Sequence, residues 1–428
     1  MNARLLAIAL LTCLAPAAAR AQRADLPAIE NVNEALDNHP AVAAALARVQ
    51  AARAARDMLA RGTHEVTVTG SYMRRSVDRE GAYDEFDATV TRPFRLPGKA
   101  ALDREAGALG IEVAENQMED ARHQAALMLA DLWHEWLTAG SLYRSDMDSV
   151  RALDAALAAL GRRVALRDAS QLELDQASAA LAQARAQAGM SRAGREQARV
   201  RLAATFPEIP LPQEPPDLAV PELPALDLEA LRALVIERSH EILAADRQAQ
   251  RLDVIARRIR ADRIADPSFG VRLFSERSGM ERGAGLVMSI PLGGGYRRSA
   301  ADQASAEANA ARFELASIRR SVMALADADL SNARTRLEAW RSADAAARGA
   351  ADAASRTERG YQLGQIDLAD LLYARRQAND ARRSEIEARS GADRALLRLQ
   401  IDSHVIWIDE EKHDHPGLNA SDAGTEPS

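Results

Sequence analysis

Four short stretches of the chain alternate apolar and polar residues with a period of two, as strands with two different faces do. They predict one pair of strands at about 64–73 and 86–94 and a second pair at about 268–275 and 284–291. A single hairpin of this kind is only marginally stable in water. Two such hairpins, each with an apolar and a polar face, favour strands of a membrane barrel that several chains close together over a cover for a soluble core.

The stretches that follow each strand pair carry apolar residues three and four positions apart, which is the spacing of an amphipathic helix. Leu174, Ala177 and Leu181 show this pattern, and the frequent alanines suit dense coiled-coil packing. No proline lies within 98–206 or within 292–415. A helix of about 60 residues is roughly 90 Å long at about 1.5 Å per residue, so the sequence predicts helices longer than a globular domain needs.

The two halves of the chain repeat the same order of parts: a helix, a strand pair, a long helix, a turn and a second long helix. Leu174 in the first half matches Leu371 in the second, an offset of 197 residues (371 − 174). The sequence therefore predicts a first structural repeat at 22–206 and a second at 225–408. The linker at 207–224 is rich in proline, which predicts a stiff and extended connection.

The ends of the chain predict an exported protein with a polar tail. Residues 1–21 contain a basic residue, a short apolar run and small residues before Gln22, which is typical of a cleaved secretory signal peptide. The only cysteine, Cys13, lies in this segment, so we expect the mature chain to contain no thiol and no disulfide. Residues 409–428 are mostly polar and predict a solvated tail.

Charge and motifs argue against several classes of function. A net charge of −7 and a pI near 5.8 provide no cationic surface for nucleic acid. His134 and Glu135 lack the second histidine of a zinc-protease helix, and two glycine-containing stretches complete no phosphate-binding loop. His413 and His415 are weak candidates for metal ligands, and a solvated tail is the favoured interpretation. We therefore expect no enzyme and no cofactor.

With these parts assigned, the chain resembles the TolC-type outer-membrane efflux proteins over nearly its whole mature length, from ENVNEALDNHP to ALLRLQ. The most specific match is GYQLGQIDLADLLYARRQANDAR, which is similar to the second helical tip of that family. Its characteristic positions are occupied by Tyr361, Gly364, Asp370 and Leu371. The stretch VTRPFRLPGK resembles the strand-to-helix junction of the heavy-metal-exporting branch.

The resemblance implies a fold that is mainly α with a membrane β-barrel. Three identical chains would each give four strands to one 12-stranded barrel in the outer membrane of a Gram-negative cell, and their helices would form a tunnel through the periplasm. The homotrimer would dock to a periplasmic adaptor and to an inner-membrane transporter, with the proton-driven type preferred. Such a chain is a passive exit duct in contact with outer-membrane lipid.

Divalent metal cations are the cargo that the resemblance to the heavy-metal branch favours, with drugs and other small organic molecules as the alternative. A periplasmic adaptor or a coiled-coil scaffold protein is a less favoured interpretation of the whole chain. Adaptors carry one helical hairpin and more strands, whereas this sequence predicts two hairpins and few strands.

The resemblance also implies roles for residues at the two helical tips, where tyrosine and acidic side chains close the pore in that family. The pore-gate residues expected here are Glu173, Tyr361, Asp367 and Asp370, with Glu173 placed by the 197-residue offset (370 − 173). Latch ion pairs are expected from Arg359, Arg375 and Arg376, and adaptor contacts from Ala169, Ser170, Gly364 and Ile366. A ring of such carboxylates would also concentrate cations.

Overall fold

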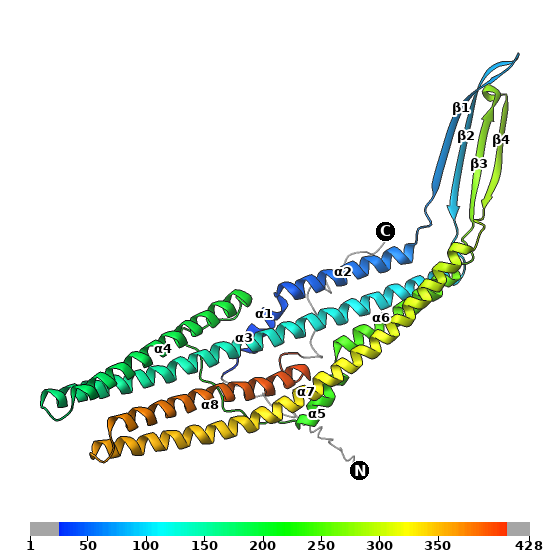
Figure 1. The fold of residues 1–428 in the computed structure, drawn as a ribbon. Coiled ribbons are helices and arrows are strands. Elements are labelled where there is room, and N and C mark those ends of the chain that lie inside the picture. Colours follow the sequence, from blue (N-terminus) through cyan, green and yellow to red (C-terminus); the bar gives the residue numbers. More distant parts are fainter. Residues whose placement is uncertain (1–24, 409–428) are drawn as a thin grey trace, which may run out of the picture.

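The computed structural model describes residues 25–408, and the predicted signal peptide and the tail with His413 and His415 lie outside the described residues. Figure 1 shows an elongated molecule with the strands at one end and the turns of two long helical hairpins at the other. The first half contains α1 (Ile29–Asp37), α2 (Pro40–Arg61), β1 (Thr67–Val77), β2 (Gly81–Pro93), α3 (Lys99–Ala165) and α4 (Gln171–Thr205). The second contains α5 (Leu228–Glu237), α6 (His240–Ala261), β3 (Ser268–Glu276), η1 (Arg277–Gly279), β4 (Glu281–Ser289), α7 (Gly295–Gln362) and α8 (Leu368–Asp402). The predicted mainly helical, duplicated fold is confirmed.

The four strands form one antiparallel sheet in the order β1-β2-β3-β4, so the hairpins of the two repeats join through β2 and β3. Val90 of β2 pairs with Val271 of β3, which pairs in turn with Leu286 of β4. β1 and β4 are edge strands, and neither has an outer neighbour within residues 25–408. A long open edge is a template for pairing with another chain.

The first hairpin is longer than predicted. β1 and β2 extend to a turn at 78–80, whereas the predicted strands stopped at 73 and resumed at 86. The sequence of this stretch looks like a polar loop, but its charges pair across the strands, as Arg75 and Glu85 do at 2.7 Å. β4 also begins earlier than the predicted position 284, at Glu281, and ends at Ser289 rather than at 291.

One face of the sheet is apolar and the other is polar. The strand register places alternate residues of all four strands on the same face. The apolar face carries large side chains that are exposed in the single chain: Val68, Tyr72, Phe86, Val90, Phe269, Val271, Leu273, Leu286 and Met288. The opposite face carries threonines and the ion pairs Arg75–Glu85 and Arg272–Asp87. The sheet therefore does not cover a core formed by its own chain.

A buried network of charges joins the sheet to the helices. Lys99, the first residue of α3, is only 2% exposed. Its ammonium group donates to the carbonyl oxygen of Ile264 and to the carboxylates of Asp262 and Asp266, each at 2.8 Å. Burial raises the pKa of Asp266, but the hydrogen bonds from Lys99 and from the N–H of Leu96 outweigh burial and lower that pKa to about 2. Lys99 thus fastens the first repeat to the α6–β3 connection of the second.

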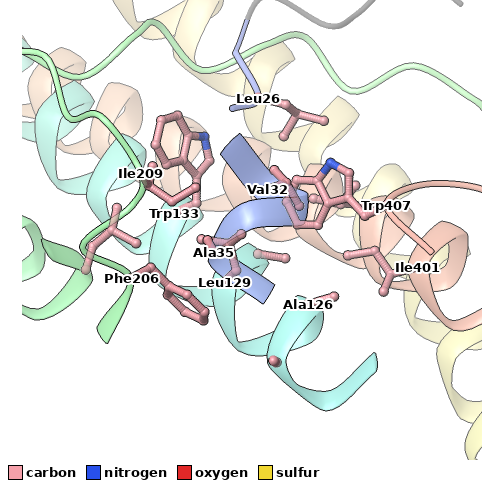
Figure 2. Close-up of a cluster of buried hydrophobic side chains, with 14 of the residues drawn as sticks. Leu26, Val32, Ala35, Ala126, Leu129, Trp133, Phe206, Ile209, Ile401 and Trp407 are labelled. Carbon is pink, nitrogen blue, oxygen red and sulfur yellow. The ribbon is translucent and has the colours of Figure 1, made fainter. Parts of the chain in front are cut away.

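The long helices α3 and α7 contain 67 and 68 residues and pair with α4 and α8 as two antiparallel hairpins (Figure 1). A cluster of buried apolar side chains surrounds the middle of α3, and Figure 2 shows Trp133 and Leu129 among its members. Phe206 at the end of α4 and Trp407 after α8 belong to the same cluster. Among residues 25–408, no helix is both long enough and apolar enough to cross a membrane.

A buried ion pair connects the two hairpins. Nε2 of His134 on α3 lies 3.0 Å from Oδ2 of Asp393 on α8, and both side chains are almost fully buried. Nδ1 of His134 lies 2.9 Å from the carbonyl oxygen of Ala130. Both ring nitrogens thus lie within hydrogen-bond distance of an oxygen atom. His134 therefore has a structural role, in keeping with its interpretation as part of the helix.

Candidate functional site at the tips of the helical hairpins

Both hairpins turn through the same backbone conformation. In the first tip Arg167 has a φ of 61°, and in the second Gly364 has a φ of 72°. These two residues are 197 positions apart (364 − 167). The following N–H donates back to the carbonyl oxygen of Arg163 at 2.8 Å in the first tip and to that of Gly360 at 2.9 Å in the second. Both helices thus end in a Schellman motif, which glycine favours and arginine adopts with strain.

Two of the predicted gate acids cap the helices that follow these turns. Ser170 and Glu173 form a capping box, in which the N–H of Ser170 donates to the Glu173 carboxylate at 2.7 Å. Asp367 is the N-cap of α8 and accepts a hydrogen bond from the N–H of Asp370 at 2.9 Å. Carboxylates at these positions stabilise a helix start. The side chain of Asp370 is exposed in the first turn of α8.

Tyr361 lies at the contact between the two hairpins. Its hydroxyl accepts a hydrogen bond from Arg163 of α3 at 3.0 Å, and the guanidinium carbon lies 5.7 Å from the centroid of the tyrosine ring. Arg163 is held in place by Asp168, whose carboxylate accepts from Nε at 2.9 Å. Beneath this contact lies a small apolar cluster that includes Leu160 of the first hairpin and Leu371 of the second.

Arg163 was not among the residues that the sequence singled out. Its counterpart at the 197-residue offset is Gly360 (163 + 197), so the repeat gave no signal for it. The partnership with Tyr361 arises from the sideways packing of two hairpins, which local periodicity does not describe.

The predicted latch arginines contact other groups than the gate acids. Arg375 pairs with Glu358 of α7 at 2.8 Å. Arg376 donates to the side chain of Gln183 on α4. Arg359 is exposed on α7. Within residues 25–408, none of the three pairs with a predicted gate acid, and their role as a latch stays a prediction.

Three of the four residues expected to contact an adaptor already make contacts within the chain. Ala169 is half-buried in the apolar cluster, and Ser170 caps its helix. Ile366 packs on Gly360, where an added Cβ would lie 2.5 Å from Cδ1 of Ile366. Gly364 is exposed.

Two of the exposed apolar side chains at the tips are leucines that the sequence analysis passed over. Leu166 is 80% exposed and Leu363 is 67% exposed. They stand at equivalent places, 197 residues apart (363 − 166), each directly before the residue with positive φ. The offset was therefore a signal from which both could have been found.

Comparison with solved structures identifies the class of fold. The outer-membrane channel OprN has a TM-score of 0.75 and 20% sequence identity, over 89% of this chain and 90% of that chain. CusC has a TM-score of 0.73 and 16% identity, over 87% and 91% of the two chains. The open state of the MtrE outer-membrane channel of Neisseria gonorrhoeae has a TM-score of 0.70 and 17% identity, over 88% of each chain. No protein-family model and no curated protein sequence matches the chain.

These neighbours define the fold as that of the outer-membrane efflux channels. This chain is therefore TolC-like in architecture, as the resemblance of its second tip predicted. The expected placement in the heavy-metal branch gains no support from the comparison.

Proposed function

We propose that the chain forms the outer-membrane channel of a tripartite efflux system in a Gram-negative cell. The observation that carries this proposal is the sheet, whose apolar face is exposed and whose edge strands β1 and β4 lack outer neighbours in residues 25–408. Strand directions alternate across the sheet, so β4 of one copy is antiparallel to β1 of the next copy in a ring. Three copies supply 12 strands (3 × 4) to a barrel with an apolar outside and a polar inside.

In this homotrimer the helical hairpins continue the duct into the periplasm. α3 has 67 residues and is roughly 100 Å long at about 1.5 Å per residue, several times the ~30 Å of a bilayer core. The chain acts as a passive conduit rather than as an enzyme. A periplasmic adaptor connects it to an inner-membrane transporter, of the proton-driven type, which supplies the energy.

The tips form the periplasmic gate of the proposed channel. The hydrogen bond from Arg163 to Tyr361 holds the two hairpins of one chain together, so separating these two hairpins requires this contact to break. Asp370 offers an exposed carboxylate near the same end. Glu173 and Asp367 support the gate by fixing the starts of α4 and α8.

The adaptor contact includes the leucines at the tips. An apolar side chain that is exposed on a polar helix end favours burial against a partner. Leu166 and Leu363 give each chain two such side chains and a trimer six (2 × 3). Ala169, Ser170, Gly364 and Ile366 flank them and shape the surface against which an adaptor packs.

Divalent metal cations are the proposed cargo, because Asp370 in each of three chains would place carboxylates around the exit path. Small organic molecules are the second candidate. It is favoured by the caps, which occupy two of the acids, and by Arg163 and Arg167, which add positive charge at the same tip.

Disulfide trapping between edge strands tests the assembly. With the signal peptide removed the chain has no cysteine, so Thr69→Cys on β1 can be combined with Gly283→Cys, Gly285→Cys or Val287→Cys on β4. We expect oxidation of outer membranes to give covalent trimers with at least one of these pairs. The control pair Thr69→Cys and Thr89→Cys, which are partners within one sheet, should give monomers only. A monomer in the soluble periplasm with no cross-link in any variant would refute the proposal.

Cargo is tested in cells that lack the gene. Loss of the channel should raise sensitivity to divalent transition metals more than sensitivity to dyes and antibiotics, and Asp370→Asn should lower the cation preference of single channels in a planar bilayer. Greater sensitivity to organic compounds alone would favour the second candidate.

A further inference from the structure

Three histidine rings meet where α8 ends, and we refer to His123, His240 and His404 as the imidazole cluster. His404 follows α8 by two residues and is 5% exposed. Its ring stacks on that of His240, the first residue of α6, with centroids 4.9 Å apart and planes at 22°. It also meets His123 of α3 edge to face at 5.4 Å. The cluster therefore fastens the end of α8 to α3 and α6.

The other side of this helix end faces α7 through a pair of buried acids. Asp402, the last residue of α8, lies 2.8 Å from Nε2 of His123 and 3.4 Å from Nε of Arg398. Arg398 also lies 3.3 Å from Asp329 of α7. The guanidinium of Arg398 thus contacts two carboxylates, and each of these side chains is less than a tenth exposed. Burial, opposed by Arg398 and reinforced by Asp402, raises the pKa of Asp329 to about 6.

The remaining charged groups around the imidazole cluster come from α3, α6 and the residue after α5. Glu241 of α6 has its pKa raised by burial and by Asp120 of α3, while His123 opposes this. Arg238 donates to the carbonyl oxygens of Ser403 and His404 at 3.2 Å and 3.3 Å. Burial, then His240, His123 and Arg238, lower the pKa of His404 to about 3. In the described residues, no group of three or more His, Cys, Asp or Glu is arranged to hold a metal ion.

Acidification changes the stability contributions of His404 and Asp329 in opposite directions. The pKa of His404 is below its unfolded value of 6.5, so its contribution to stability is complete above pH 6.5 and is lost as the pH falls from there. The pKa of Asp329 is above its unfolded value of 3.8, so its contribution is complete below that value and is lost as the pH rises through about 6. Burial and the neighbouring rings of His240 and His123 disfavour a charged His404 in the folded state, whereas a protonated Asp329 no longer repels Asp402.

We propose that the end of α8 is a pH-responsive joint, which weakens its contact with α3 and α6 on acidification while it keeps its contact with α7. The contacts support this asymmetry, because Oδ1 of Asp402 meets His123 of α3, whereas Oδ2 meets Arg398, which also contacts Asp329 of α7. The α7/α8 hairpin then moves more freely against α3 in acid. The inference concerns the folded chain alone and holds whether or not the chain exports metal cations.

Hydrogen exchange at pH 7.5 and pH 5.5, corrected for the intrinsic rate, tests the joint on the full-length protein in detergent. We expect amides of residues 400–408 to exchange at least tenfold faster at pH 5.5. Amides of residues 326–337 on α7 should change by less than twofold. The double variant His240→Phe/His404→Phe keeps two stacking rings but removes their titration, so the acceleration at 400–408 should fall below twofold.

The matched control is His39→Phe, because His39 also contacts an aromatic ring, that of Phe206 at 5.4 Å, but lies outside the imidazole cluster. It should keep the tenfold response. Should the double variant fail to fold, His404→Phe alone is expected to reduce the response to below threefold, because it removes the buried group whose pKa is lowered. An equal response in the variants and the wild type, no response in the wild type, or an equal acceleration on α7 would overturn the proposal.

Discussion

Replacing Lys99 should open the junction between the sheet and the helices. It is one of two lysines among 55 basic residues, and its position suits a compact ammonium group with three donors rather than a planar guanidinium. A pKa of about 2 for Asp266, against 3.8, corresponds to about 2 kcal/mol of stability, part of which comes from Lys99. Lys99→Met removes the ammonium group that pairs with Asp266, whose side chain is 16% exposed, and removing one member of a buried ion pair costs about 3–5 kcal/mol. Lys99→Arg should recover less than half of that loss.

Urea unfolding of the purified protein in detergent, followed by circular dichroism, measures this loss. The pKa of Asp266 is lowered in the folded state, so its contribution is present above about pH 4 and disappears as the pH falls towards 2. The stability difference between Lys99→Met and the wild type should therefore shrink over that range. Arg257→Met is the control, because Arg257 pairs with Glu105 at an exposed site where a salt bridge contributes about 0–1 kcal/mol. A Lys99→Met protein as stable as this control would refute the reasoning.

Three further predictions concern single contacts. Arg167→Gly should raise the free energy of unfolding by about 1 kcal/mol in the same urea assay, because glycine adopts the positive φ of that turn without strain; a loss of stability would contradict this. Tyr361→Phe should increase single-channel conductance in planar bilayers at unchanged trimer yield, because it deletes the hydrogen bond from Arg163, and an unchanged conductance would remove Tyr361 from the gate. His134→Ala should lower the free energy of unfolding, measured by circular dichroism, by about 3–5 kcal/mol because it removes the contact of His134 with the buried Asp393, and the double variant with Asp393→Ala should lose less than the sum of the two single variants.

The order of helices and strands could be predicted because the apolar residues of each element recur with the period of a helix or of a strand. The ends of the strands could not, because Arg75 and Glu85 look like loop residues until their register across the hairpin is known. Ser170 and Glu173 show the reverse situation. Their spacing is that of a capping box and is legible in the sequence, but the family resemblance directed attention to a gate. The contact of Arg163 with Tyr361 depends on how two hairpins lie side by side, and no local pattern encodes that.

The two tips share a backbone conformation, but the residue that contacts the neighbouring hairpin stands at a different position in each tip. Tyr361 has Val164 as its counterpart in the first repeat (361 − 197), and Arg163 has Gly360 in the second. In the proposed ring, boundaries within one chain alternate with boundaries between neighbouring chains. The contact between arginine and tyrosine can form at the first kind of boundary, whereas at the second kind the equivalent positions hold valine and glycine. A trimer then has three such fastened boundaries and three without this contact, so separation of the tips should begin between chains rather than within them.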